Sequence, residues 1–226
     1  MAVFEPAMAE LDIQPRECRW AHLSLCVLDA VHSIGVRYET VKALCWKYGE
    51  PLLGTVLVAP AKVGTYVEQP LREFAEWAVE LGEAELADAL GNHHRTSTRR
   101  GAPLKTRADI EYAQILVRHG INLLGDAADL LGDAERLARV EADLATVPGH
   151  GWSGIRMNYL WMLVGSDDRI KPDRMVRRWL GRHLGREVGV GEAVELVTKL
   201  AAANDRTPWE VDHAIWRAQR SRPKRG

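Results

Sequence analysis

The sequence has few cysteines and no long apolar run. Three cysteines, Cys18, Cys26 and Cys45, occur among 226 residues, and they lack the close paired spacing of metal-binding thiols. We therefore expect buried, reduced thiols rather than a disulfide framework or a metal site. No segment reaches the roughly 18 apolar residues that cross a bilayer, and the N-terminus lacks the basic and apolar regions of a secretory signal. These absences favour a cytoplasmic protein without a membrane partner, and we expect no metal and no cofactor.

An excess of charge of either sign is also lacking. The chain has 30 Lys and Arg against 31 Asp and Glu, so its formal net charge is −1. Such a balance gives no overall attraction to nucleic acid, and any contact with DNA must come from local basic patches. With 46% hydrophobic and 27% charged residues, the composition is that of an ordinary soluble protein with one sizeable core or two small lobes.

Helical periodicity dominates the sequence and predicts an all-α fold. The segment 51–70 contains prolines, glycines and valines, and we interpret it as a loop with a short helical turn, because a solitary strand has nothing obvious to pair with. Thr106 with Asp109 predicts a capping pair at one helix start, and Asp133 predicts a cap at another. Apolar residues recur at helical spacing in the segments 19–32, 39–49, 71–91, 107–120, 126–132, 134–147, 153–164, 174–186, 191–204 and 208–220.

Residues 92–107 form a basic segment with five Lys or Arg and no acidic residue. Two interpretations stay open, a solvated surface loop and a loop that contacts phosphates through Arg95, Arg99 and Arg100. His93 and His94 are adjacent and cannot both face one metal ion from a regular helix, so we expect no metal here.

A Pro-Gly-x-Gly hairpin lies between two of the predicted helices. Glycines leave room for backbone N–H groups to converge on an anion, and the helix that follows adds its positive end. The second helix, 153–164, is apolar nearly all round, so we expect it to be the buried centre of the fold, with Tyr159 and Trp161 in the core. The residues predicted to contact DNA at this hairpin are Pro148, Gly149, His150, Gly151, Trp152 and Ser153.

Asp173 lies after a proline at the start of a basic helix. One role for it is a helix cap. The other is a catalytic carboxylate, because an ionised Asp173 can stabilise positive charge on a sugar or activate water. Lys171 and Arg174 flank it and either bind phosphates or lie at the surface.

The residues "VPGHGWSGIRMNYLWMLVG" followed by "KPD" resemble the helix-hairpin-helix and downstream aspartate of the DNA glycosylase superfamily that includes endonuclease III and the adenine glycosylase. The separation of Asp173 from Gly151, 173 − 151 = 22 residues, fits that family. The resemblance implies a two-lobed helical fold and a flipped nucleotide in a cleft between the lobes. We expect one two-lobed unit over 1–226, with a central lobe at about 30–165 ending in the hairpin motif and a second lobe formed by 1–29 and 166–226.

Three departures from the family pattern bear on activity. Ser153 stands where bifunctional members carry lysine, the glutamine of the early helix pair is missing from "DAVHSIGV", and no four-cysteine iron–sulfur loop follows. The resemblance therefore implies a monofunctional N-glycosylase of base-excision repair, acting as a monomer on DNA and associated with the nucleoid. The alternatives are a non-catalytic DNA-binding protein that keeps the hairpin grip, and a helical interaction module in which the hairpin is purely structural.

Overall fold

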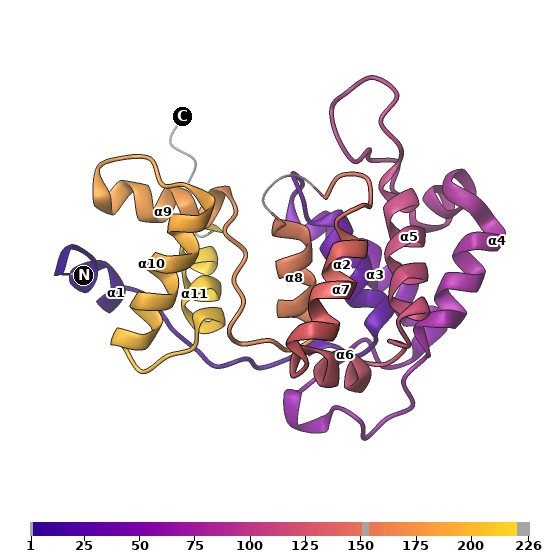
Figure 1. The fold of residues 1–226 in the computed structure, drawn as a ribbon, viewed down its shortest axis with the longest axis horizontal. Helices are drawn as coiled ribbons and strands as arrows, with labels where there is room; N and C mark the ends of the chain where they lie inside the picture. Colours follow the sequence, from indigo (N-terminus) through magenta and orange to yellow (C-terminus); the bar gives the residue numbers. More distant parts are fainter. Residues whose placement is uncertain (1, 151–153, 221–226) are drawn as a thin grey trace. The chain divides into compact units, whose positions relative to one another are not determined.

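The computed structural model describes residues 2–150 and 154–220. These residues form eleven α-helices, two short 3-10 helices and two strands of two residues each (Figure 1). The all-α expectation is therefore confirmed. Within the described ranges, no helix is both long and apolar enough to cross a membrane.

The chain divides into two compact units. Unit 1 consists of Met1–Glu17 and Ser166–Gly226, and unit 2 is the continuous stretch Cys18–Gly165. The sequence placed the N-terminal boundary after residue 29, which lies inside a helix whose ten residues are all buried in the unit 2 core. A boundary there would cut a helix out of the core that it stabilises, and the structure divides the chain before that helix instead.

Unit 2 is built around α2 (Leu23–His32), which is buried along its whole length and packs against α3, α5 and α8. The sequence assigned the central position to α8, but several apolar side chains of α8 are only partly buried, while Trp161 is in the core as expected. The remaining elements of unit 2 are β1 (Arg19–Trp20), α3 (Tyr38–Leu53), β2 (Leu57–Val58), η2 (Pro60–Lys62), α4 (Leu71–Leu90), α5 (Lys105–Arg118), α6 (Leu124–Leu131), α7 (Ala134–Leu144) and α8 (Ile155–Leu163).

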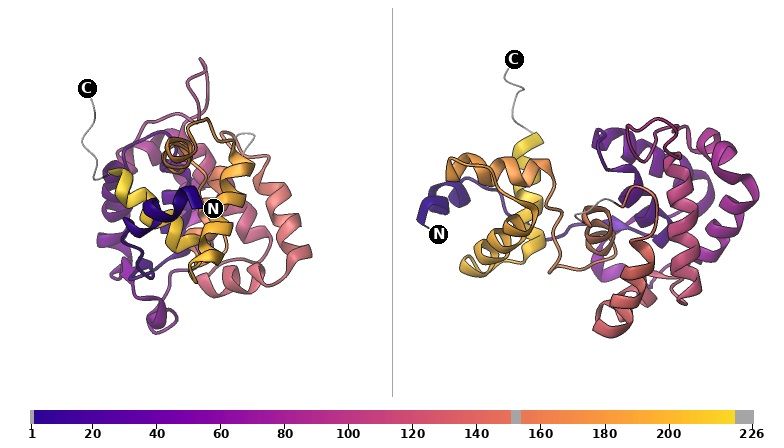
Figure 2. Two further views of the ribbon diagram at one scale, coloured as in Figure 1. Left: turned by 90° about the vertical axis from the view of Figure 1, so that its left-hand side faces the viewer. Right: turned by 45° about the horizontal axis from the view of Figure 1, so that its top comes forward.

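Helices α4 and α5 lie side by side in unit 2 (Figures 1 and 2). Helix α4 is interrupted at Gly82, whose backbone has φ 73° and ψ 177°, and it ends at Gly91 in the left-handed conformation. Both conformations favour glycine because a side chain would be strained at positive φ. The connection from α4 to α5 carries the basic segment that the sequence singled out.

A short antiparallel ladder joins β1 and β2. Arg19 pairs with Val58 and Trp20 pairs with Leu57. The segment 51–70 therefore contains a strand as well as the expected helical turn, η2. Its partner lies more than thirty residues earlier in the chain, just before α2, and local sequence patterns carry no sign of such a distant pairing.

Unit 1 has a smaller core of its own. Phe4 stacks on Trp179 with ring centroids 5.7 Å apart, and the two side chains are almost fully buried. The aliphatic side chains Val197 and Ile215 close the same core from two further helices. The elements of unit 1 are η1 (Ala2–Phe4), α1 (Glu5–Ala9), α9 (Arg174–Leu184), α10 (Val190–Ala203) and α11 (Pro208–Arg220).

Candidate nucleic-acid interface

The connection between α7 and α8 lies where the sequence predicts a hairpin, and its first residues form a turn. Asp133 caps α7 by accepting a hydrogen bond from the Arg136 backbone N–H at 3.0 Å, as expected. The chain then turns at Pro148 and Gly149, where the His150 N–H donates to the Val147 carbonyl at 3.1 Å. Pro148, Gly149 and His150 lie within this turn. The other three predicted hairpin residues, Gly151, Trp152 and Ser153, lie outside the described residues.

Gly149 is the point where the hairpin meets the basic loop, defined here as residues 92–104. Its φ is +78°, and a Cβ atom built on it would lie 2.8 Å from the Thr96 Cβ and 3.1 Å from the Thr96 carbonyl oxygen. Glycine is therefore required for both backbone conformation and close approach. The structure thus brings together two segments that the sequence treated separately, and both lie at one end of unit 2 (Figure 1).

The basic loop folds back on itself and keeps its arginines outside. Arg95 forms an isolated antiparallel bridge with Leu104, and its guanidinium donates to the Ala102 carbonyl. Arg95, Arg99 and Arg100 are all exposed, and no ion pair joins them to an acidic residue within the described ranges. The loop that approaches Gly149 at Thr96 therefore carries three exposed cationic side chains.

Arg156 on α8 donates a hydrogen bond to the hairpin backbone, a role that the sequence patterns did not reveal. Its side chain is only 1% exposed, and its Nη1 donates to the Pro148 carbonyl at 2.8 Å. Its guanidinium carbon lies 5.6 Å from the Tyr112 ring centroid. Burial lowers the pKa of Arg156, and the nearby Tyr112 and Asp109 oppose that change. The sequence did contain a sign of this role, because Arg156 is the single cation in a largely apolar helix. A cation that is buried with such a helix needs a buried partner.

Beneath the hairpin, α5 contributes a buried polar cluster rather than a cap. Asp109 pairs with His32 at 2.8 Å with both side chains fully buried, and burial raises the pKa of Asp109 while His32 lowers it. Thr106 donates to the Glu83 carbonyl at 2.7 Å. The expected Thr106 and Asp109 capping pair is therefore wrong, because tertiary partners take up both side chains and α5 begins after Leu104 without a side-chain cap.

Lys105 shows that part of the basic segment is not available to a ligand. Its Nζ donates to the carbonyls of His32 at 3.0 Å and Ile34 at 2.7 Å, and the side chain is buried. Its positive charge also lies near Asp109 and lowers the pKa of that carboxyl. The cation that the sequence counted in a surface patch is thus a structural part of the unit 2 interior.

The histidines of this end behave differently from one another. His150 is half-buried, and burial, followed by the charge of Arg156, lowers its pKa. His93 lies 3.2 Å from Asp88 in an exposed pair. No group of three or more metal-binding side chains occurs among residues 2–150 and 154–220.

Asp173 is the N-cap of α9 in unit 1. Its Oδ1 accepts hydrogen bonds from the backbone N–H groups of Met175 at 2.7 Å and Val176 at 3.3 Å. The side chain is half-buried, so Asp173 has the capping role that the sequence allowed. Lys171 and Arg174 flank it in unit 1, and Arg174 is exposed.

A second carboxyl, Asp212 on α11, lies close to Asp173 and was not foreseen. Asp212 is 5% exposed, and its Oδ1 accepts a hydrogen bond from the Lys171 N–H at 3.3 Å. Burial, followed by the charge of Asp173, raises the pKa of Asp212 well above its ordinary value. Burial thus disfavours the ionised form of Asp212, and the nearby Asp173 adds to this effect.

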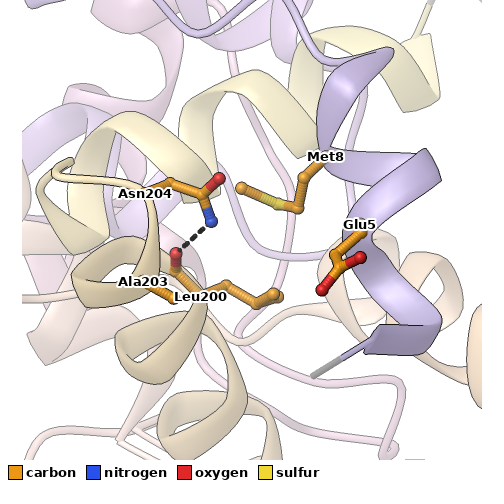
Figure 3. Close-up of a pocket in the computed structure, with 5 residues that line it drawn as sticks. All are labelled: Glu5, Met8, Leu200, Ala203 and Asn204. Carbon is orange, nitrogen blue, oxygen red and sulfur yellow. Dashed lines mark hydrogen bonds between the residues drawn. The ribbon is translucent and has the colours of Figure 1, made fainter.

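Unit 1 contains a small cavity between α1 and α10 (Figure 3). It measures about 110 Å³ and is lined by Glu5, Met8, Leu200, Ala203 and Asn204, whose Nδ2 donates to the Leu200 carbonyl at 2.7 Å. Pockets that enclose organic ligands usually measure about 300–1,000 Å³. This cavity is too small for a flipped nucleotide.

Comparison with known proteins gives a family but no activity. No curated protein matches the chain. A family model described as a domain of unknown function, DUF8548, matches residues 2–220, which cover nearly the whole chain. The protein therefore belongs to the DUF8548 family.

Proposed function

We propose that the protein binds DNA through the hairpin and the basic loop of unit 2. The observation that carries this proposal is the close approach of Gly149 to Thr96, because it joins a backbone turn to a loop with three exposed arginines. Arginine side chains suit phosphate oxygens, since the planar guanidinium donates two hydrogen bonds in parallel. Backbone N–H groups in a glycine turn add neutral donors for the same phosphate.

The buried cluster below the hairpin favours a stiff binding surface. Arg156 holds the Pro148 carbonyl, and the Asp109 and His32 pair lies in the same interior. A surface that is already held in position loses less conformational entropy when a ligand binds. The hairpin resemblance to DNA glycosylases agrees with this assignment, and the balanced charge of the chain implies an affinity that depends strongly on local contacts and on salt.

The experiment that tests DNA binding uses the full chain and a fluorescently labelled 20-base-pair duplex, with anisotropy measured over a range of salt concentrations. The triple variant R95Q/R99Q/R100Q should weaken binding and reduce the salt slope, log Kobs against log [salt], by up to about 3 in magnitude if each arginine contacts one phosphate. The matched control R72Q/R118Q/R139Q removes three exposed arginines elsewhere in unit 2. Equal losses in the two variants would contradict the assignment, since only net charge would then matter.

A second proposed function is excision of a damaged or unusual base, with Asp173 as the catalytic carboxylate. The specific observation in its favour is that Oδ1 of Asp173 takes both capping hydrogen bonds. Among the described residues, Oδ2 accepts none, and the side chain is half-buried. One oxygen is thus left to accept a proton from water or to face a cationic sugar.

In this reaction the bond between the sugar C1′ and the base nitrogen breaks, and its electron pair leaves with the base. A water oxygen then forms a bond to C1′, while Asp173 accepts the proton that this water releases. The departing base takes up a proton from solvent or from an acidic group, which restores the balance of charge. Flipping the nucleotide out of the duplex costs a few kcal/mol, and less for a mismatched or damaged base.

A base-release assay tests this second function. Wild type and Asp173→Asn are compared on duplexes that carry uracil or alkylated, oxidised or deaminated bases, and binding is measured in the same samples. Release that is lost in Asp173→Asn while binding persists supports excision. If the protein binds every duplex but releases no base, the non-catalytic DNA-binding protein is the remaining interpretation. If it neither binds DNA nor releases a base, the remaining interpretation is a helical interaction module.

A further inference from the structure

Helix α9 has two faces of opposite character. Val176, Trp179 and Leu180 are buried in the unit 1 core. The exposed face carries three arginines, each four residues from the next: Arg174, Arg178 and Arg182, named here the arginine row. Four residues of α-helix rise about 6 Å, so the row extends about 12 Å along the surface.

The three charges of the arginine row are not neutralised within the described residues, because no ion pair or hydrogen bond joins them to another group. Other arginines of the same helix and its C-terminal end are occupied. Arg177 donates to the Val188 carbonyl at 2.7 Å, and Arg186 pairs with Glu192 at 3.0 Å. The guanidinium groups of the arginine row are thus available to bind a ligand.

Helix stability does not explain why an arginine occupies position 174, the first of the arginine row. The N-terminal turn of a helix favours negative side chains, since its backbone dipole is positive there. Helix α9 has no acidic residue in its first turn, and Arg174 directly follows the N-cap Asp173. Arg182, in the last turn, does agree with the dipole. A cation at the unfavourable end indicates that the row serves a contact outside the helix.

We propose that the arginine row is a second nucleic-acid contact, which binds consecutive phosphates of a DNA strand on unit 1. A strand of B-DNA carries one phosphate per roughly 3.4 Å of helix axis, so a row of about 12 Å spans several of them. An anionic membrane is the less suitable partner, because a helix that lies in a lipid surface must insert its apolar face. The apolar face of α9 is buried in the core: Val176 is 1% exposed and Leu180 is 0% exposed.

This inference rests on the proposed DNA binding and extends it from Arg174, which the sequence singled out, to Arg178 and Arg182. Its test uses the same full-length protein, labelled duplex and salt series. The variant R174Q/R178Q/R182Q is compared with the unit 2 control R72Q/R118Q/R139Q, and thermal melting of each variant monitors folding. We expect the row variant to bind about tenfold more weakly or worse, with a salt slope smaller by up to about 3, while the control binds like wild type.

The outcomes separate the two proposals. If R95Q/R99Q/R100Q weakens binding while the row variant and the control do not, the hairpin assignment holds and the arginine row is wrong. If only the row variant weakens binding, the row holds and the hairpin assignment fails. Absence of DNA binding by the wild type overturns both. Flotation with vesicles that contain phosphatidylserine tests the membrane, and vesicle binding that depends on the row, without DNA binding, also overturns the inference.

Discussion

The two units contain equal numbers of Lys and Arg residues but use them differently. Unit 1 has 15 Lys and Arg against 13 Asp and Glu, a net charge of +2, and unit 2 has 15 against 18, a net charge of −3. Among the described residues, unit 1 buries a single charged side chain, Asp212, and exposes its arginines along α9. Unit 2 buries a larger set of acidic, basic and histidine side chains: His22, Asp29, His32, Lys105, Asp109 and Arg156.

This difference shows how the role of a charged side chain depends on whether it is buried or exposed. A buried cation must be matched by buried acceptors, so Arg156 and Lys105 fix the positions of the backbone carbonyls to which they donate. An exposed cation contributes little to the stability of the fold, and where it has no partner in the protein it is available to a ligand. Mutations of the buried charged residues should therefore destabilise unit 2, and mutations of exposed arginines in either unit should alter ligand binding.

The largest expected effect is the loss of Arg156. Arg156→Met removes a buried cation near Asp109 and leaves the Pro148 carbonyl without its donor. Breaking a buried charge interaction from one side typically costs about 3–5 kcal/mol in the free energy of unfolding. Chemical denaturation and hydrogen exchange of unit 2 measure this loss. The control Arg178→Met, on the surface of unit 1, should change stability by less than about 0.5 kcal/mol, and equal effects would remove the contrast between the units.

Acidification should destabilise unit 1 through His213. This ring stacks on Trp209 with centroids 4.8 Å apart, and burial, followed by Arg217, Arg16 and Arg220, lowers its pKa to about 4. Because the folded pKa is below the ordinary value, protonation favours the unfolded state, and stability falls as pH decreases from about 6.5 to about 4.

His213→Phe keeps an aromatic ring in the stack and removes the titration. Between pH 7 and pH 4.5 the wild type should lose about 2 kcal/mol more than the variant in unit 1, after allowance for partial solvent exposure. Hydrogen exchange resolved by segment reports unit 1 separately, since a chain of two units need not unfold in one step. Identical pH dependence in wild type and variant would show that His213 is not the titrating group.

Acidification should stabilise unit 2 through the protonation of one side chain, Glu68. Its Oε1 accepts hydrogen bonds from the N–H groups of Leu124 at 2.8 Å and Leu23 at 3.2 Å, at the starts of α6 and α2. Burial raises its pKa to about 7, although these two hydrogen bonds and Arg19 oppose the rise. A carboxyl with a raised folded pKa binds its proton more tightly in the folded state, so its contribution to stability decreases as pH rises from about 4.5 to about 7.

Glu68→Gln isolates this effect, because glutamine can still accept both hydrogen bonds but does not titrate. The stability of the wild type relative to Glu68→Gln should decrease by about 1–2 kcal/mol between pH 4.5 and pH 7.5, a value reduced for the partly exposed side chain. The exposed Glu135→Gln of α7 serves as a control, and its stability relative to wild type should change little over the same interval. A constant difference between wild type and Glu68→Gln would contradict the raised pKa.

The smallest effect concerns the cap of α9. Asp173→Ala removes the acceptor for the N–H groups of Met175 and Val176 and should destabilise unit 1 by about 0.5–1 kcal/mol. Asp173→Asn should lower the free energy of unfolding by only about a few tenths of a kcal/mol, because asparagine is also a good N-cap residue. Thermal melting of the two variants measures this difference. A large loss in Asp173→Asn would make it unsuitable as the catalytic test, and Asp173 would then be assigned a structural role.

Local sequence patterns predicted the helices and several of their ends. The Asp133 cap follows from an interaction within a few residues, and such interactions are readable from the sequence. The Thr106 and Asp109 pattern failed because the same side chains had stronger partners in the core, Glu83 for one and His32 for the other.

The sequence by itself determined the all-α class and the positions of the main helices, and it placed a turn at Pro148 and Gly149 between two of them. Only the tertiary structure decided which charges are buried and which segments meet. Thr96 and Gly149 are 53 residues apart in the chain, and Arg156 of α8 lies near Tyr112 and Asp109 of α5, far earlier in the chain. The physical reason is that a side chain's burial and partners depend on the packing of distant segments, whereas helix formation depends on neighbours within one or two turns.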